Sequence, residues 1–183
     1  MPGPDPLDPA VEQMLAGDER AFRTVYRAVQ PPLLRYLSVL VGRGEAEDVA
    51  SETWAQAFRD LDRFTGDADG FRGWVTTIGR NRALDHLRHN RRRPTDERTV
   101  EEMVDLLDDA DVEGDTLGRV DSQAALALVS SLPPDQAEAI MLRTVLGFDA
   151  VTAGEILGKS PGAVRAASFR GLRQLAKKID RHP

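Results

Sequence analysis

The sequence has no cysteine and only three histidines, and this scarcity limits the chemistry that the chain can perform. Without thiols it cannot form an internal disulfide, a thiolate zinc site or a thiol redox switch. The histidines are scattered, so we expect neither a metal centre nor a cofactor. The chain also lacks a nucleophile–base set and a glycine-rich loop that could cradle phosphates. An enzyme is therefore disfavoured, and we predict no catalytic residues.

Long hydrophobic runs are missing as well. No apolar stretch approaches the ~20 residues of a membrane-spanning helix, and Met1 to Pro9 lacks the basic and apolar segments of a signal peptide. The length of 183 residues suits one domain or two small ones, and a hydrophobic content of 41% is enough to build real cores. We expect a soluble, cytoplasmic protein.

The period-two alternation of a β-strand is also absent, whereas helical periodicity recurs along the chain. Asp8 and Asp18 are predicted N-caps. Pro31-Pro32 is predicted to open a new helix, which Gly42 and Gly44 would end. The sequence therefore predicts an all-α fold, with helices at about residues 8–17, 18–29, 31–41, 45–61, 70–93, 124–132, 133–146, 151–157 and 160–179.

Charge is unevenly distributed in this chain, whose formal net charge is −6. Residues 94–121 hold eleven carboxylates against two arginines, a composition typical of an acidic flexible linker. An alternative is a calcium or magnesium site, but the glycine and the terminal glutamate of a known calcium loop are missing. Its ligands would be Asp105, Asp108, Asp109 and Asp111. We predict an N-terminal segment with a short helix at 1–17, helical domains at 18–93 and 121–183, and the linker at 94–120.

The helix predicted at residues 70–93 changes character along its length. Its first half has apolar residues at helical spacing, which predicts a buried anchor: Phe71, Trp74, Val75 and Ile78. A polar stripe runs along its flank and continues to the basic end: Thr77, Asn81, Asp85, Arg88 and Arg92. By itself, this pattern is equally compatible with an ordinary core helix whose basic end is solvated.

The C-terminal residues follow the pattern of a helix-turn-helix. Gly158 ends one short predicted helix, and Ser160-Pro161 starts a long one. Residues 159–179 carry six basic side chains and no acidic one, which favours a phosphate-binding surface over a basic helix without a partner. Four positions of the final helix are predicted to face inward: Val164, Ala167 or Ser168, Leu172 and Leu175.

Four segments in fixed order resemble one known family. They are FRTVYRAVQPPLLRYL, EAEDVASETWAQAFRDLDRF, FRGWVTTIGRNRALDHLRHNRR and LPPDQAEAIMLRTVLGFDAVTAGEILGKSPGAVRAASFRGLRQL. The chain resembles the extracytoplasmic-function (ECF) group of bacterial RNA polymerase sigma factors. The resemblance implies that the first domain binds the clamp helices of core RNA polymerase and melts the −10 promoter element. It implies that the second domain binds the −35 element as duplex, that the linker enters the RNA exit path, and that an anti-sigma factor restrains the protein.

The resemblance also implies roles for individual residues. Asp48 and Glu52 would bind polymerase, although the family usually has glutamine where this chain has Ser51. The −10 element would be bound by Thr65, Gly66, Asp67, Asn81, Asp85, Arg88, Arg91 and Arg92. The −35 element would be bound by Lys159, Ser160, Ala163, Arg165, Ala166, Arg170 and Arg173.

Two departures from the family pattern affect the second domain. Ala163 and Ala166 replace the usual threonine and serine, which removes two hydroxyls and shifts weight to the arginines and to apolar contact with thymine methyls. Ala153 and Gly154 replace the usual isoleucine–alanine pair, so we expect the first helix of the motif to pack less well. The predicted function is promoter selection by a polymerase-bound factor. The alternative is a free-standing helix-turn-helix regulator with a ligand-sensing or dimerisation half.

Overall fold

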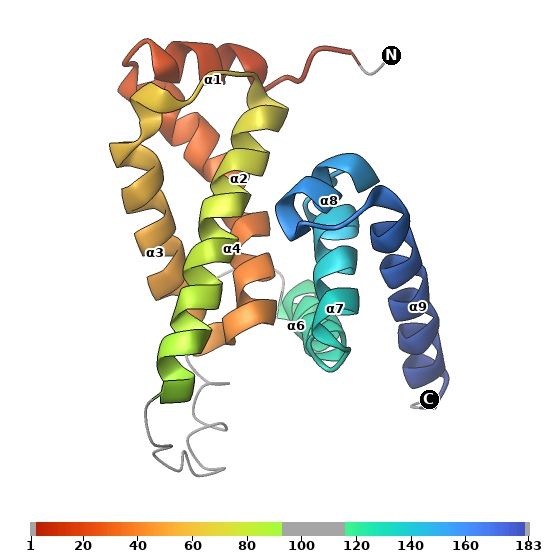
Figure 1. Ribbon diagram of the computed structural model, residues 1–183. Helices are drawn as coiled ribbons and strands as arrows, with labels where there is room; N and C mark the ends of the chain where they lie inside the picture. Colours follow the sequence, from red (N-terminus) through yellow and green to blue (C-terminus); the bar gives the residue numbers. More distant parts are fainter. Residues whose placement is uncertain (1–2, 93–115, 182–183) are drawn as a thin grey trace.

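The computed structural model describes the backbone of residues 3–92 and 116–181 and the side chains of residues 3–92 and 122–181. Among those residues the only regular secondary structure is helical, with no strand, which confirms the predicted all-α class. Its N-terminal half contains α1 (Asp8–Leu15), α2 (Glu19–Val41), α3 (Arg43–Arg59), the 3-10 turn η1 (Leu61–Arg63) and α4 (Ala68–Arg92). Its C-terminal half contains α6 (Thr116–Ser130), α7 (Pro134–Ile140), the π-helical turn η2 (Met141–Val145), α8 (Ala150–Leu157) and α9 (Pro161–Asp180). Figure 1 shows the two groups of helices side by side.

Helix α2 is one continuous helix, so the break predicted at Pro31-Pro32 is wrong. Its buried residues repeat at intervals of four across the prolines: Val25, Val29, Leu33 and Leu37. A proline in a helix interior costs about 3 kcal/mol, whereas each fully buried aliphatic side chain contributes about 1.5–3 kcal/mol. Burial of this face therefore offsets the missing backbone hydrogen bonds. The predicted cap at Asp18 is confirmed, because its carboxylate accepts hydrogen bonds from the backbone N–H groups of Arg20 and Ala21.

Two short-range predictions in this half fail. Gly42 does separate α2 from α3, with a positive φ of 86°, but Gly44 lies inside α3 rather than ending a helix. Asp8 is not the N-cap of α1, because it is the first residue of that helix and Leu7 precedes it. The Asp8 carboxylate instead accepts a hydrogen bond from the backbone N–H of Ala68, which begins α4. A local sequence pattern could not reveal that partner.

Helices α8 and α9 form the predicted helix-turn-helix. Gly158 ends α8 in the left-handed conformation (φ 64°), and the Ser160 hydroxyl accepts a hydrogen bond from the N–H of Ala163, which confirms the cap of α9. Gly154 lies where α8 meets the turn, and a Cβ added there would be 2.5 Å from the Lys159 carbonyl oxygen. The glycine thus permits a close approach, so the expected loss of packing at Ala153 and Gly154 gains no support.

Helix α9 turns a different edge inward from the one predicted. Val164, Ala167 and Ser168 are buried as expected, but Leu172 is 48% exposed. Gly171 takes the inward place, and a Cβ added there would meet the Ile140 side chain at 2.6 Å. The prediction for Leu172 is wrong because α9 turns position 171, and not position 172, toward α7. The two helices lie so close there that only a glycine fits.

The two halves contact each other through α2 and α4 on one side and α6, α7, η2 and α8 on the other. At the centre of this contact the carboxylate of Glu138 accepts hydrogen bonds from the Tyr36 hydroxyl (3.3 Å) and the Arg80 guanidinium (2.7 Å). Burial, followed by the nearby Glu138 charge, raises the pKa of Tyr36 well above its ordinary value, so the hydroxyl stays protonated and donates. The sequence did not indicate this contact.

Several expectations fall on residues without described coordinates. The predicted acidic linker and the candidate metal ligands Asp105, Asp108, Asp109 and Asp111 lie mainly at 93–115, outside the described residues. Among the residues that the structure describes, no group of histidine and acidic side chains could hold a metal ion. In the same residues no helix is long and apolar enough to cross a membrane.

Candidate polymerase and nucleic-acid interfaces

Helix α4 combines the buried anchor and the polar stripe predicted for it. Phe71, Val75 and Ile78 are buried, and Trp74 is half-buried against the rings of Phe64 and Phe71. Along the other side, four members of the polar stripe are exposed, Asn81, Asp85, Arg88 and Arg92, and so is the adjacent Arg91. At 1.5 Å per residue, the distance from the start of α4 to its basic end is about 36 Å. The helix is long enough to follow several nucleotides of an extended strand.

Asn81 and its neighbours differ in whether their side chains form hydrogen bonds or ion pairs within the protein. Within the described residues no hydrogen bond involves the Asn81 side chain, so its amide is available to a ligand. Arg82 donates to the Gln56 side chain at 2.8 Å and helps to join α4 to α3. Asp85 pairs with Arg88 at 3.2 Å, and both side chains are 67% exposed. Such an exposed pair is weak and leaves both groups free to exchange partners.

The loop before α4 presents Thr65, Gly66 and Asp67 as exposed residues. Gly66 has a φ of 150°, and a Cβ added there would lie 3.1 Å from the Phe64 ring. The Asp67 carboxylate accepts a hydrogen bond from the N–H of Gly70 at 2.9 Å and so caps α4. The loop therefore lies at the N-terminal end of the same helix that carries Asn81.

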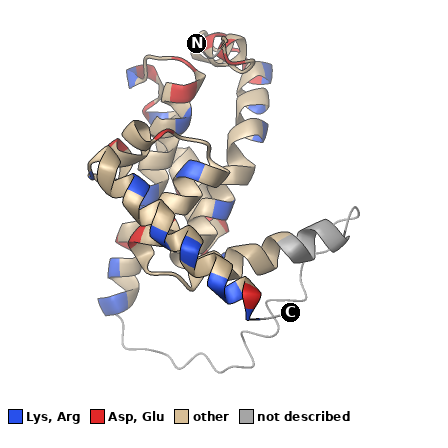
Figure 2. Ribbon diagram, turned by 90° about the vertical axis from the view of Figure 1, so that its right-hand side faces the viewer, with Lys and Arg blue, Asp and Glu red and all other residues tan. Residues whose placement is uncertain are grey.

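Lysine and arginine residues recur along helix α9 (Figure 2), and among them Arg165, Arg170, Arg173 and Lys177 are exposed. Its cap and outward side expose every residue predicted to contact duplex DNA: Lys159, Ser160, Ala163, Arg165, Ala166, Arg170 and Arg173. The Arg173 guanidinium lies 5.8 Å from the centre of the Phe169 ring, which is itself 63% exposed. Near the C-terminus, Lys178 donates to the hydroxyl of Ser131 and so also ties α9 to the end of α6.

The start of α8 is fixed by a cap that the sequence analysis missed. The Asp149 carboxylate accepts a hydrogen bond from the N–H of Thr152 at 2.8 Å. This bond, together with a further one to the Thr152 side chain, lowers the pKa of Asp149. Position 149 lies directly before an apolar run, which is the ordinary signal for a cap. The cap orients the helix that supports α9.

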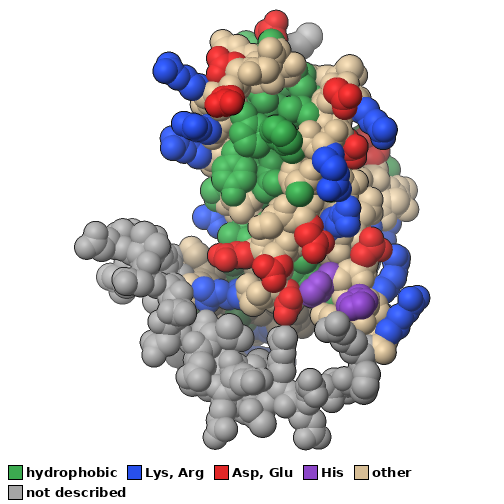
Figure 3. Space-filling model, turned by 90° about the vertical axis from the view of Figure 1, so that its left-hand side faces the viewer, with side chains coloured by type: hydrophobic (Ala, Val, Ile, Leu, Met, Phe, Trp, Pro, Cys, Tyr) green, Lys and Arg blue, Asp and Glu red, His purple; other side chains and the backbone are tan. Residues whose placement is uncertain are grey.

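Helix α3 exposes Asp48 and Glu52 as predicted, and Ser51 between them. Farther along α3, seven residues after Ser51 and so on the same side of the helix as Ser51, lies Phe58, which is 64% exposed. Its ring meets Phe22 edge to face at 5.6 Å, and Phe22 in turn contacts Tyr26 and Trp54. Figure 3 shows the resulting hydrophobic patch, with acidic side chains gathered beyond it on the same face.

This aromatic patch, made of Phe22, Tyr26, Trp54 and Phe58, went unnoticed in the sequence. The spacing of Phe58 from Ser51 does place these two on one side of a helix. Phe22 and Tyr26, however, belong to an apolar stripe that helical periodicity alone would assign to the core. Only the packing of α2 on α3 shows that they remain accessible.

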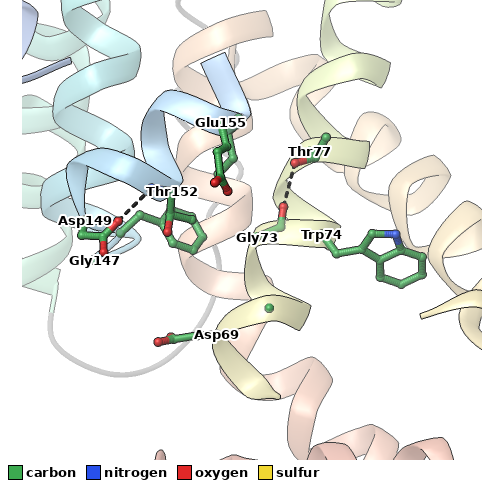
Figure 4. Close-up of a pocket in the computed structure, with 11 residues that line it drawn as sticks. Asp69, Gly73, Trp74, Thr77, Gly147, Asp149, Thr152 and Glu155 are labelled. Atoms are coloured by element: carbon green, nitrogen blue, oxygen red, sulfur yellow. Dashed lines mark hydrogen bonds between the residues drawn. The ribbon is translucent and has the colours of Figure 1, made fainter. Parts of the chain in front are cut away.

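A cavity of about 480 Å³ lies between α4 and α8 (Figure 4). Its charged lining residues are Asp69, Asp149 and Glu155, all acidic. Among its other lining residues are Trp74 and Thr77, and the indole of Trp74 points away from α8. With three carboxylates and no cation in its described lining, this cavity is unsuited to phosphate. The candidate nucleic-acid contacts therefore lie on exposed helix faces instead.

Comparison with known proteins identifies two matching regions. The Sigma-70 region 2 model matches residues 25–93, and the Sigma-70 region 4 model matches residues 122–175. The ECF RNA polymerase sigma factor ShbA of Streptomyces griseus is 32% identical over 173 residues, which cover 90% of this chain and 91% of that protein. The ECF RNA polymerase sigma factor BldN of Streptomyces coelicolor is 33% identical over 169 residues. That match covers 91% of this chain, but the chain spans only 63% of the length of BldN.

Two solved structures have a similar fold. The sigma factor RpoE of Bartonella quintana, crystallised with the anti-sigma factor NepR, gives a TM-score of 0.66 at 23% identity and covers 88% of this chain and 98% of its own. CnrH, in complex with the cytosolic domain of CnrY, gives a TM-score of 0.65 at 22% identity and covers 95% of this chain and 97% of its own. At these identities the likeness shows a shared fold.

Proposed function

Because the chain belongs to the ECF group of RNA polymerase sigma factors, we propose that it binds core RNA polymerase and directs it to specific promoters. It reads the −35 element as duplex and melts and reads the −10 element. It works in the cytoplasm, without a cofactor or an active site of its own. The observation that carries the proposal is the presence in one chain of a cation-lined helix-turn-helix and a separate helix with an exposed amide and arginine stripe.

The −35 contacts belong to α9. Its first turns carry Arg165 and Arg170 outward, where the recognition helix of a helix-turn-helix enters the major groove. Arginine can bind the O6 and N7 atoms of guanine through two hydrogen bonds. Lys159, Ser160 and Arg173 flank this segment and contact phosphates. Ala163 and Ala166 offer only methyl groups, which suit contact with thymine.

The −10 contacts belong to α4 and the loop before it. Asn81 offers both a donor and an acceptor to the Watson–Crick edge of an extruded base, because an amide carries both. Arg88, Arg91 and Arg92 neutralise the backbone of the melted strand, and Arg88 can exchange its exposed ion pair with Asp85 for a phosphate. Thr65, Gly66 and Asp67 bound the other end of this surface.

Polymerase binding belongs to the exposed face of α3. Asp48 and Glu52 provide acidic groups for a basic partner surface, and the aromatic patch adjoining them provides apolar area to bury. Aromatic residues are enriched where protein interfaces form, and charged groups at the rim steer association. The sigma factor RpoE, which has a similar fold, was solved with the anti-sigma factor NepR, which makes such a protein a second expected partner.

Transcription in vitro tests this function. Core RNA polymerase should produce specific transcripts only when the chain is added, and sequencing their 5′ ends should reveal common −35 and −10 elements. The chain alone should not footprint those promoters. A sharp footprint without polymerase, combined with no effect on transcript starts, would instead support a free-standing regulator.

A further inference from the structure

The segment before the region matched by the family model is bound to the start of α4. That match begins at residue 25, whereas Asp5 and Asp8 lie well before it. One oxygen of Asp8 accepts a hydrogen bond from the N–H of Ala68 (3.0 Å), and the other accepts one from the N–H of Asp5 (3.0 Å). The Asp5 carboxylate binds the guanidinium of Arg72 through both oxygens. We call these two aspartates the N-terminal clasp.

The clasp completes the capping of α4 from a distance. The first N–H groups of a helix have no partner within it, and a residue just before the helix usually satisfies one of them. Asp67 holds that place and accepts from Gly70, which leaves the N–H of Ala68 to Asp8. Ala68 is completely buried, so water cannot easily replace that carboxylate. Both carboxylates also suit the positive end of the helix dipole.

Buried apolar side chains anchor the segment that carries the clasp. Leu7 is 8% exposed, Val11 1% and Met14 3%, so α1 is packed into the core beside the clasp. The Asp5–Arg72 pair is only partly exposed, at 22% and 27%, and the hydrogen bond from Arg72, followed by one from the Leu7 backbone, lowers the pKa of Asp5. The carboxylate thus stays ionised at neutral pH.

The element that the clasp holds is the loop of Thr65, Gly66 and Asp67. On its N-terminal side, the Phe64 ring packs on Phe71 and Trp74 at 5.4 and 5.1 Å. On its C-terminal side, the next residue after Asp67 is Ala68, the partner of Asp8. The loop is therefore fixed at both ends although its own residues are exposed. It also shares with α1 a cavity lined by Asp8, Glu12, Leu15, Gly66 and Asp67.

We propose that Asp8, supported by Asp5, is a positioning residue for recognition of the −10 element. This proposal rests on the function proposed above, in which this loop borders the extruded bases. A loop already held in its bound conformation loses less entropy when it binds, and contacts that require one geometry then discriminate better between bases. Loss of the clasp should therefore reduce base discrimination at −10 and spare binding to −35 duplex.

The test compares three variants of the full chain with core RNA polymerase. Asp8→Ala removes both acceptors, Asp8→Asn keeps one oxygen that can accept from Ala68, and Val11→Ala weakens the packing of the same helix without touching the clasp. The measurement is the ratio of open-complex rates on the cognate promoter and on one with altered −10 bases. Thermal unfolding of each variant is recorded in parallel. In Asp8→Ala the ratio should fall about fivefold, the equilibrium factor that corresponds to one helix cap.

Val11→Ala should keep the wild-type ratio even if its melting temperature falls as far as that of Asp8→Ala. Asp8→Asn should restore most of the wild-type ratio. The proposal is overturned if Asp8→Ala leaves the ratio unchanged, or if Val11→Ala lowers it equally, because the role would then be structural. A wild-type chain that opens no promoter with polymerase would overturn the proposed function as well. If the wild type opens promoters but Asp8→Ala leaves the ratio of open-complex rates unchanged, only the positioning role is overturned.

Discussion

At the scale of single residues, α4 and α9 each present groups whose roles can be separated by where they act. Asn81 has no hydrogen-bond partner among the described side chains and lies one turn beyond the buried Ile78. The base edge that it would read is hidden in a closed duplex and becomes accessible only after melting. Its contribution should therefore appear at melting and not at −35 docking.

Asn81→Ala should spare −35 binding and slow open-complex formation. Permanganate reactivity of −10 thymines would be followed on a closed promoter and on one with a pre-melted bubble. We expect a defect that changes with the identity of the −10 bases. A defect indifferent to those bases, accompanied by a lower melting temperature, would mean that Asn81 is merely structural.

Arg165 and the terminal lysines of α9 should behave differently. Arg165→Ala should cost about 1–3 kcal/mol on the cognate −35 site and relax discrimination there, because it removes a base contact. Lys177→Ala should weaken binding to all sequences and reduce the salt dependence, because it removes a phosphate contact. Lys177 is the better control, since Lys178 also bonds Ser131. Equal weakening of cognate and scrambled duplexes by Arg165→Ala, in a fluorescence anisotropy titration, would reject the assignment.

At the scale of helices, the exposed face of α3 has an acidic end and an aromatic end. Asp48 and Glu52 are exposed, so their replacement should change stability by no more than ~0.5 kcal/mol. Asp48→Arg with Glu52→Arg should nevertheless abolish co-purification with core RNA polymerase. Glu155→Arg, at an exposed carboxylate on α8 and so outside this face, is the charge-reversal control. Normal co-purification of the double variant would refute the role of this face.

The helices also show what sequence patterns can and cannot predict. Periodicity located the anchor of α4, and local caps located Asp18 and the start of α9, because these signals depend on residues within one turn. Pro31-Pro32 misled because the burial that keeps α2 continuous comes from other helices. Asp8 misled for the same reason, since its partner lies sixty residues away. The roles of the predicted site residues remain predictions, because exposure alone does not identify a ligand.

At the scale of the whole molecule, the acidic composition of residues 94–120 sets the domain boundaries that we predict. Exposed, polar chain segments are preferred sites of proteolytic cleavage. Limited proteolysis of the free protein should cut first between Arg93 and Arg119, as judged by mass spectrometry of the early fragments. First cuts within residues 22–61 would contradict the boundary.

The contact between the two halves limits the distance that the closed molecule can span on promoter DNA. A compact chain of 183 residues has a radius of gyration of about 16 Å, and hence a diameter of roughly 40 Å. The −10 and −35 elements are separated by about 25 base pairs, or roughly 85 Å at 3.4 Å per pair. The halves must therefore separate before both elements can be bound. Separation exposes Glu138, which is 6% exposed in the closed molecule, and Tyr36, which is fully buried.

Glu138→Ala should shift the free protein toward separated halves. It removes the acceptor for Tyr36 and leaves the Arg80 charge unpaired in the contact, and breaking a buried pair from one side typically costs 3–5 kcal/mol. Because the chain has no cysteine, Glu47→Cys and Gln174→Cys give two exposed dye sites on α3 and α9. Energy transfer between the dyes should fall in Glu138→Ala, while helicity stays unchanged. Unchanged transfer would show that apolar packing, and not the Glu138 bonds, holds the halves together.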